Sequence, residues 1–180
     1  MKNKTRTADN FALQTPQSAL AFIALGSNLG DSPQILRDAM ARLQVFSDAP
    51  LLQSSIWQTS PVDCPPGSPP FLNAVVGFFP QKKETPETLL IKLQDLEKVF
   101  GRTPKKILNE PRPLDLDLIA FGTERRATTQ LTLPHPRAHQ RRFVLQPLCE
   151  IAPDLILPGQ TQTVAQLLAS LPVDAACVKI

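Results

Sequence analysis

LDLDLIAF, residues 114–121, alternates leucine with aspartate before it becomes fully apolar. Successive side chains of an extended chain point to opposite faces, so the leucines face a core while Asp115 and Asp117 face the other way. The Cα atoms of the two aspartates are then about 6.6 Å apart, at about 3.3 Å per residue. The stretch therefore predicts a strand with a buried leucine face and a carboxylate pair on the opposite face.

Two carboxylates at this spacing are suited to hard divalent cations. Mg²⁺ typically takes one or two protein carboxylates and keeps its other positions for water and substrate phosphates. A solvated strand face is the alternative, because a D-x-D pair alone is short and common. Basic residues nearby favour the metal site, since guanidinium groups pair well with phosphate. They are Arg112 just before the strand and His135, Arg137, His139, Arg141 and Arg142 in the segment PHPRAHQRR.

The composition of the whole chain is typical of a soluble protein with one folded domain. The chain has 180 residues, 42% of them hydrophobic and 19% charged, and a net charge of +3. No apolar run approaches the ~20 residues of a membrane helix, and the charge is too small for a polynucleotide-binding surface. We expect a disordered polar tail over residues 1–17 and a single domain over 18–180. The tail lacks the apolar core of a secretory signal, which predicts a cytoplasmic location.

Hydrophobic periodicity predicts an alternation of strands and helices in the order βαββαβ. The predicted strands are residues 18–25, 51–60, 70–80 and 114–121, and the predicted helices are residues 33–47 and 86–100. Further helical turns and a last small strand follow. This order favours an α+β sandwich with helices on one face of a mainly antiparallel sheet, and with C-terminal additions.

Some aromatic and amide side chains are candidates for binding a flat substrate. Phe71 and Phe143 each lie beside a loop and a polar neighbour, where they could sandwich a heterocycle, although Phe is more often a core residue. Asn73 shares a strand face with Phe71, and its amide could meet the polar edge of such a ring. The segment GSNLGD, residues 26–31, is no phosphate-binding G-x-x-x-x-G-K-S/T loop, and we interpret it as a strand-to-helix turn.

Several co-linear segments together resemble the 6-hydroxymethyl-7,8-dihydropterin pyrophosphokinase family. They are AFIALGSNLGD, SSIWQTSPV, FLNAVVGF, LQDLEKVFGR, PRPLDLDLIAFG, LTLPHPRAHQRRFVLQPL and EIAPDLILP, and they fall within residues 20–158. The resemblance implies a ferredoxin-like fold. It also implies an ATP-dependent diphosphotransferase of folate biosynthesis, which moves diphosphate from ATP to the hydroxyl of 6-hydroxymethyl-7,8-dihydropterin and releases AMP.

The same resemblance implies roles for individual residues. Asp115 and Asp117 would hold two Mg²⁺ ions on the ATP triphosphate, and they would form the catalytic set with Arg102, Arg112 and Arg141. The implied ATP-binding residues are Gln94, Arg112, Thr132, His135 and Arg141. The implied pterin-binding residues are Thr59, Val62 through its backbone, Phe71, Asn73 and Phe143.

The loop after Gly101 departs from the family pattern. Pro104, Asn109 and Glu110 stand where the family commonly has an arginine, an aromatic residue and a glycine, and Lys105 or Lys106 could replace the missing charge. We therefore expect weaker closure over ATP, not lost activity. Glu97 and Arg102 match the family's E-x-x-x-G-R pattern, either as supports of this loop or as a surface ion pair.

Two other functions stay open at this point. One is a metal-dependent nuclease or nucleotidyltransferase built on the same aspartates, although an obvious third acidic residue is missing. The other is a pterin or nucleotide binder whose altered loop has removed catalysis. The expected partners are ATP and the pterin, without nucleic acid or membrane, and contact with a neighbouring folate-pathway enzyme is left open.

Overall fold

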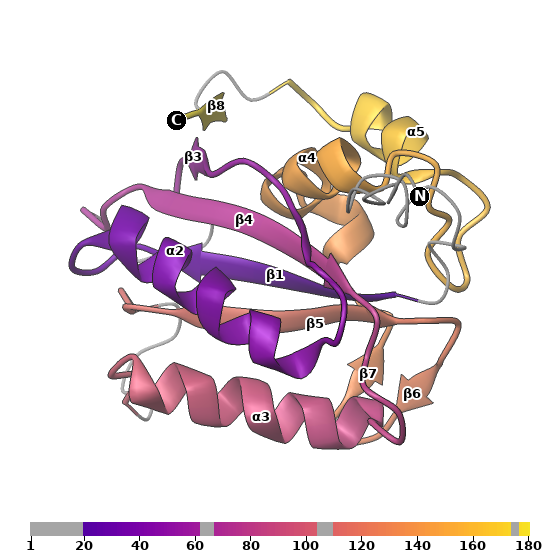
Figure 1. The fold of residues 1–180 in the computed structure, drawn as a ribbon. Coiled ribbons are helices and arrows are strands. Elements are labelled where there is room, and N and C mark those ends of the chain that lie inside the picture. Colours follow the sequence, from indigo (N-terminus) through magenta and orange to yellow (C-terminus); the bar gives the residue numbers. More distant parts are fainter. Residues whose placement is uncertain (1–19, 62–66, 104–109, 174–176) are drawn as a thin grey trace, which may run out of the picture.

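The computed structural model describes residues 20–61, 67–103, 110–173 and 177–180 (Figure 1). The predicted tail over residues 1–17 lies outside these ranges, as do Val62, Pro104, Lys105, Lys106 and Asn109. The strands are β1 (Ala21–Ser27), β2 (Leu52–Gln53), β3 (Trp57–Thr59), β4 (Phe71–Phe78), β5 (Asp115–Phe121), β6 (Arg126–Ala127), β7 (Thr132–Leu133) and β8 (Val178–Lys179). The helices are α2 (Ser32–Leu43), α3 (Pro86–Val99), α4 (Arg142–Ile151) and α5 (Val164–Ser170), with 3-10 turns η2 (Gln44–Phe46) and η3 (Ala138–Gln140).

The main sheet has the strand order β5-β1-β4-β3-β8, with β2 also paired to β4 (Figure 1). Its pairings are antiparallel, and β1 lies between β4 and β5. The predicted βαββαβ order and the ferredoxin-like sandwich are confirmed. The predicted strand over residues 51–60 is divided into the short strands β2 and β3, while β6 and β7 form a separate two-stranded sheet.

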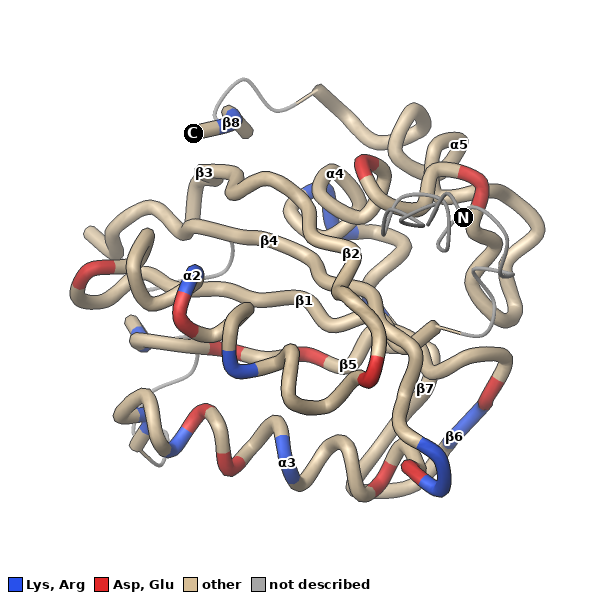
Figure 2. The backbone as a smooth tube through the Cα atoms, in the orientation of Figure 1, with Lys and Arg blue, Asp and Glu red and all other residues tan. Residues whose placement is uncertain are grey.

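Charged residues are distributed unevenly over the sheet. The tube view shows no Lys, Arg, Asp or Glu on β1 or β4, whereas β5 carries two acidic positions (Figure 2). These positions are Asp115 and Asp117, and both are half-buried, not fully exposed. Within the described residues, no helix is both long and apolar enough to cross a bilayer.

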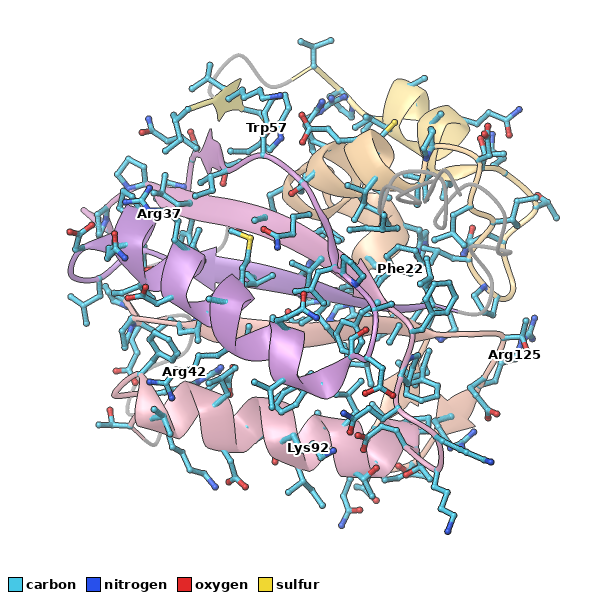
Figure 3. All side chains as sticks on the ribbon, viewed as in Figure 1. Phe22, Arg37, Arg42, Trp57, Lys92 and Arg125 are labelled. Atoms are coloured by element: carbon cyan, nitrogen blue, oxygen red, sulfur yellow. The ribbon has the colours of Figure 1, made fainter. Side chains whose placement is uncertain are left out.

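The helices α2 and α3 begin where their caps predict. The Asp31 side chain accepts a hydrogen bond from the N–H of Gln34, and Thr85 forms a reciprocal capping box with Thr88. The exposed side of α2 carries Arg37 and Arg42 (Figure 3). The helices therefore direct their apolar stripes toward the sheet.

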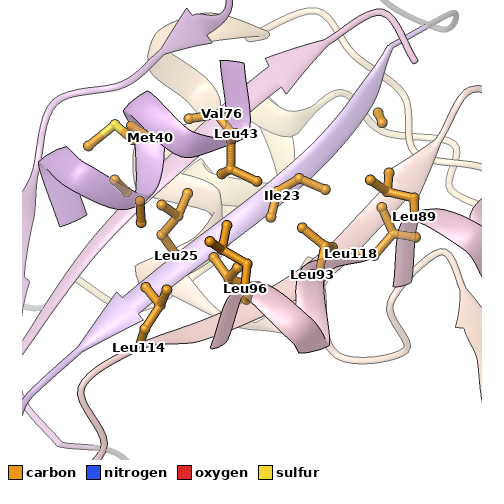
Figure 4. Close-up of a cluster of buried hydrophobic side chains, with 14 of the residues drawn as sticks. Ile23, Leu25, Met40, Leu43, Val76, Leu89, Leu93, Leu96, Leu114 and Leu118 are labelled. Atoms are coloured by element: carbon orange, nitrogen blue, oxygen red, sulfur yellow. The ribbon is translucent and has the colours of Figure 1, made fainter. Parts of the chain in front are cut away.

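The first face of the sheet packs against α2 and α3. Leu114, Leu116 and Leu118 are buried there, as their alternation with aspartate predicts. They contact the apolar stripes of both helices in one cluster, which includes Leu43 of α2 and Leu93 of α3 (Figure 4). Burial of apolar surface is worth about 25 cal/mol per Å², so this cluster is the main source of stability on this side.

The second face of the sheet is covered in part by α4 and α5, so the prediction of helices on one face only is wrong. Phe22 of β1, Val75 of β4 and Ile119 of β5 point to this face and are fully buried. They join Val144 and Leu145 of α4 in a second cluster. Large apolar side chains on both faces require cover on both faces, and the segment after β7 supplies the second cover.

Candidate active site

The outward side chains of β1 decrease in size along the second face. Phe22, Ala24 and Gly26 are spaced by two residues and therefore point to the same side. Phe22 fills the space beneath α4, whereas the smaller residues leave a hollow. The residues lining this pocket are Ala24, Leu25, Gly26, Thr59, Ser60, Phe71, Asn73, Arg112, Asp115, Asp117, Arg137, Arg141 and Phe143.

The register of the sheet places polar side chains on both sides of the small residues. Gly26 is paired with Asn73 on β4 and with Asp115 on β5, while Ala24 is paired with Asp117. A Cβ atom on Gly26 would stand 3.5 Å from Oδ1 of Asn73 and 3.8 Å from Cβ of Asp115. The floor of the pocket is therefore formed by the backbone of Gly26 and the methyl group of Ala24. The side chains of Asn73, Asp115 and Asp117 form its walls.

Two arginines hold the carboxylate of Asp115. Arg102 Nη1 is 2.6 Å from Oδ1, and Arg112 Nη2 is 2.8 Å from Oδ2. Arg102 also forms an ion pair with Glu97 of α3. Both oxygens of Asp115 are thus neutralised in this state, so a cation that binds Asp115 must displace or share these guanidinium groups.

Glu97 is buried at the end of α3, which overturns the surface ion pair considered from the sequence. Its carboxylate accepts a hydrogen bond from the N–H of Leu116 at 2.7 Å, between the two aspartates. Burial raises the pKa of Glu97 to about 7, against the lowering effects of the Leu116 N–H and of Arg102, and the charges of Asp115 and Asp117 add to the rise. Glu97 links α3, the loop after Gly101 and the aspartate strand.

Asp117 lines the same pocket as Asp115 and is paired with Ala24 of β1. Burial raises its pKa, and the charge of Asp115 raises it further, while His135, Arg141 and Arg112 act in the opposite direction. Like charges this close favour a cation between them, because a shared counterion stabilises both ionised carboxylates. The described residues contain no group of three or more His, Cys, Asp or Glu that could hold a metal alone. The donor set thus fits Mg²⁺ completed by phosphate and water.

Asn28 positions Arg112, and the sequence analysis missed this role. The N–H of Arg112 donates to Oδ1 of Asn28 at 2.9 Å, and the N–H of Asn28 donates to the carbonyl of Arg112 at 3.2 Å. The Arg112 guanidinium lies 5.6 Å from the centre of the Phe71 ring. Within the described part of the chain, Nδ2 of Asn28 and Nε of Arg112 are buried without a hydrogen-bond partner. A buried Asn directly after a buried strand was the signal that our interpretation as a simple turn overlooked.

His135 is held against the aspartate strand with a defined ring orientation. Its backbone N–H donates to the carbonyl of Ile119 at 2.8 Å, and its ring Nδ1 accepts from the backbone N–H of Arg137 at 3.2 Å. Burial lowers the pKa of His135, Arg141 and Arg137 lower it further, and Asp117 opposes them. A neutral ring whose Nδ1 accepts carries its proton on Nε2, which leaves Nε2 as a donor.

Thr59 and Asn73 form a buried pair on the side of the pocket opposite the aspartates. Nδ2 of Asn73 donates to Oγ1 of Thr59 at 2.7 Å, and the two residues are 6% and 4% exposed. This bond directs Oδ1 of Asn73 toward the hollow above Gly26. On the α4 side, the Arg141 guanidinium lies 5.4 Å from the centre of the Phe143 ring.

The structure brings most of the predicted site residues to one pocket, but not all of them. Arg102 and His135 stand just outside the pocket lining, where Arg102 contacts Asp115 directly. Gln94 on α3 and Thr132 on β7 are exposed and do not line the pocket. Residues that line it without having been assigned a role are Ala24, Leu25, Gly26, Ser60 and Arg137. The small outward residues of β1 are visible in the sequence as the other half of its alternation.

The fold is a ferredoxin-like sandwich whose second face carries a pocket with paired carboxylates. A sequence profile of the family described as 7,8-dihydro-6-hydroxymethylpterin-pyrophosphokinase (HPPK) matches residues 22–153. The chain belongs to this family.

Relatives in several organisms are similar over most of this chain. A Bacillus subtilis 2-amino-4-hydroxy-6-hydroxymethyldihydropteridine pyrophosphokinase is 41% identical over 133 residues, which are 73% of this chain and 77% of that protein. The Haemophilus influenzae protein of the same name is 37% identical over 147 residues, 82% of this chain and 89% of the relative. The folic acid synthesis protein fol1 of Pneumocystis carinii is 37% identical over 76% of this chain, but this region is only 18% of that protein.

Solved structures share the fold at low identity. The wild-type Plasmodium falciparum HPPK-DHPS with SDX-DHP has a TM-score of 0.65 at 11% identity, with 83% of this chain and 44% of that chain covered. The chain thus spans less than half the length of this HPPK-DHPS structure.

Proposed function

We propose that the pocket on the second sheet face is the active site in which ATP and the pterin meet. The reaction is that of the family: the chain transfers diphosphate from ATP to the hydroxyl of 6-hydroxymethyl-7,8-dihydropterin in folate biosynthesis. The products are AMP and the pterin diphosphate. The observation that supports this site is that Asp115 and Asp117 share one pocket with three arginines and two phenylalanine rings.

Asp115 and Asp117 would hold two Mg²⁺ ions on the triphosphate. Two carboxylates with phosphate and water are a ligand set that Mg²⁺ accepts. Burial and the charge of Asp115 raise the pKa of Asp117, so a cation near both groups would favour their ionised forms. The bound ions supply charge neutralisation on the phosphate oxygens. Arg102 can then turn from Asp115 to its second partner, Glu97, without becoming an unpaired buried charge.

The chain's own donors would hold the phosphates around these ions. Arg112 and Arg141 line the pocket, and bidentate guanidinium groups fit phosphate oxygens. His135 would donate from Nε2, since Nδ1 is occupied by the N–H of Arg137. Gln94 and Thr132 would contact the nucleotide beyond the pocket rim.

The pterin would lie over the floor formed by Ala24 and Gly26, between Phe71 and Phe143. Oδ1 of Asn73 would accept an N–H of the ring, with Thr59 fixing the amide orientation. Val62, which lies outside the described residues, would contact the pterin through its backbone.

The pterin hydroxyl attacks the β-phosphorus of ATP in line, the bond from β-phosphorus to the bridging oxygen breaks, and AMP leaves with that oxygen. Such transfers depend mainly on positioning and on stabilising charge. Arg112, Arg102 and Arg141 would stabilise charge on the transferred and leaving oxygens, and we assign no general base.

The test is AMP release from ATP with the pterin alcohol and Mg²⁺. We expect AMP and pterin diphosphate in equal amounts, with neither formed when the pterin or the metal is left out. Quenching of Trp57 by the pterin without AMP formation would instead identify a binder that has lost catalysis. AMP release that does not need the pterin would contradict the proposed acceptor.

We also propose that this chain contacts a neighbouring folate-pathway enzyme. The support is that solved relatives are HPPK-DHPS chains, in which the matching region is 42–45% of the chain length. Sedimentation of this chain with a separate DHPS should show a faster component. Two independent boundaries at high concentration would contradict the contact.

A further inference from the structure

Two elements near the C-terminus contact the parts of the fold that carry pocket residues. The match to the family ends at residue 153, so α5 and β8 lie beyond it. In Figure 1, α5 lies beside α4, and β8 lies beside β3 at the edge of the sheet. Phe143 lies in the first turn of α4 and Thr59 ends β3, and both residues line the pocket.

Arg142 connects the start of α4 to the end of α5. It stands between the pocket residues Arg141 and Phe143, but its guanidinium points away from the pocket toward the chain after α5. Its acceptors are the carbonyls of Pro172 and Leu171, both at 2.8 Å, and of Leu168 at 3.3 Å. Leu168 lies in the last turn of α5, and Leu171 and Pro172 directly follow the helix, so Arg142 donates to carbonyls at and just beyond its C-terminal end.

The strand β8 holds β3 from its outer side. Lys179 is paired with Trp57 and Val178 with Gln58, and the N–H of Ile180 donates to the carbonyl of Ile56 at 3.1 Å. Without β8, the three residues of β3 would form an edge strand paired with β4 alone. Short edge strands are weakly held.

Glu150 of α4 connects this helix, which Arg142 links to α5, with the pair of strands β3 and β8. Its Oε2 accepts from the N–H of Ser55 at 2.7 Å, just before β3, and its Oε1 accepts from Nζ of Lys179 at 3.0 Å. The start of α4, the end of α5, β8 and β3 therefore form one connected frame around the side of the pocket that carries Thr59 and Phe143. The aspartates lie on β5, at the opposite edge of the sheet.

We propose that the region beyond residue 153 is a brace that positions the pterin side of the active site, with Arg142 as its positioning residue. The inference rests on the proposed function, because it takes Thr59 and Phe143 as pterin contacts. Arg142 fixes the position of Phe143 through α4, and β8 fixes Thr59 through β3. Thr59 in turn orients the amide of Asn73.

A chain that ends at Val173 tests the strand connection. It lacks β8 but keeps all three carbonyls that Arg142 contacts. We expect emission of Trp57, the sole tryptophan, to shift to longer wavelength, because its strand loses a neighbour. The KM for the pterin should rise about tenfold, the effect of roughly one lost hydrogen bond, while the KM for ATP stays within about twofold. Lys179→Ala removes the ion pair with Glu150 but keeps the backbone pairing of β8, so it should raise the KM for the pterin less than the truncation does.

Arg142→Ala tests the helix connection. It should raise the KM for the pterin, and Arg142→Lys should restore part of the loss through one of the carbonyl contacts. Arg37→Ala, at an exposed arginine of α2, should behave as the unchanged chain does. If the truncated chain and Arg142→Ala both keep the unchanged KM for the pterin while they stay folded, the brace is refuted.

Amide hydrogen exchange separates this proposal from the proposed function. In the truncated chain, residues 55–59 should exchange faster while β5 does not, whether or not the protein turns over ATP and pterin. If the full-length chain is inactive but truncation still speeds exchange at residues 55–59, the proposed function alone is refuted. Unchanged exchange at residues 55–59 would refute the brace alone.

Discussion

The two halves of the second sheet face are made by the same strands and differ in the side chains that point outward. In the covered half, Phe22, Val75 and Ile119 are large and apolar, and α4 buries them. In the open half, Gly26 lies between Asn73 and Asp115. Covering the first half gains the free energy of apolar burial, whereas covering the second would leave carboxylate and amide groups unsatisfied. The site is therefore located where the outward side chains of β1 become small and those of its neighbours become polar.

The largest expected effect on turnover comes from removing a carboxylate of the open half. Asp115→Ala should lower turnover at least about a hundredfold, because a metal ligand and charge partner on the triphosphate is lost. The fold should persist, since Arg102 keeps its pairing with Glu97. Turnover and thermal unfolding measured on the same sample check both parts. Near-normal turnover would end the assignment of Asp115 as a metal ligand.

The buried carboxyl beside the open half should make stability depend on pH. Among the residues that the structure describes, Glu97 is the buried one that carries a charged group. Its burial raises the pKa of the carboxyl from 4.5 to about 7. The folded protein then holds a proton that the unfolded chain releases, so the free energy of unfolding falls as pH rises from about 4.5 to 7. The change is up to about 3 kcal/mol, at about 1.4 kcal/mol per pKa unit. Urea unfolding without divalent cations should show a flatter pH dependence for Glu97→Gln, and equal slopes in both proteins would contradict the assignment.

A methyl group added to the covered half should destabilise the protein. A Cβ atom on Gly77 would stand 2.8 Å from Cε1 of Phe22, whose ring is fully buried beneath α4. Gly77→Ala should therefore lower the free energy of unfolding by about 1–3 kcal/mol, as overpacked cores do. The KM for the pterin should not change, because Gly77 does not line the pocket. A variant with unchanged stability would show that the covered half is not tightly packed.

In the open half, hydrogen bonds to Asn28 hold the backbone of Arg112 in place. Asn28→Ala removes the acceptor of the Arg112 N–H and should lower turnover about tenfold through misplacement of the guanidinium. Asn28→Asp keeps an acceptor oxygen at this position and should retain more of the turnover. Steady-state kinetics of the two variants decide the point, and equal losses would show that the amide group matters for another reason.

The sequence predicted what local periodicity controls and missed what depends on strand register. The alternation in LDLDL correctly gave the buried leucines, and the helix predicted over residues 86–100 matches α3. The bond between Asn28 and Arg112 joins residues 84 positions apart, and no local pattern reports such a contact. The cover by α4 was missed for a related reason, because the apolar outward positions of β1, β4 and β5 form a continuous surface only after the strands are paired.

Residue roles that hydrophobic periodicity cannot predict were assigned from the resemblance to the family. Gln94 and Thr132 were assigned by resemblance alone, and their exposed positions outside the pocket leave those roles as predictions. The small size of Ala24 and Gly26 was readable in β1 from the start. That these small residues form a pocket floor could be inferred only from the strand register, which places Gly26 between the amide of Asn73 and the carboxylate of Asp115.

The smallest expected effect is that of a methyl group added to the open half, and it is the direct counterpart of Gly77→Ala. In Gly26→Ala the new Cβ would meet its nearest neighbours at 3.5–3.9 Å, which is ordinary van der Waals contact. Stability should therefore stay within about 0.5 kcal/mol of the unchanged protein. The methyl group would occupy the pocket floor and raise the KM for the pterin by up to about tenfold, the lower end of what one such group is worth in a binding site. If Gly26→Ala lost stability as Gly77→Ala is expected to, while keeping its KM, the two halves would be packed alike and the hollow above Gly26 would not be the pterin site.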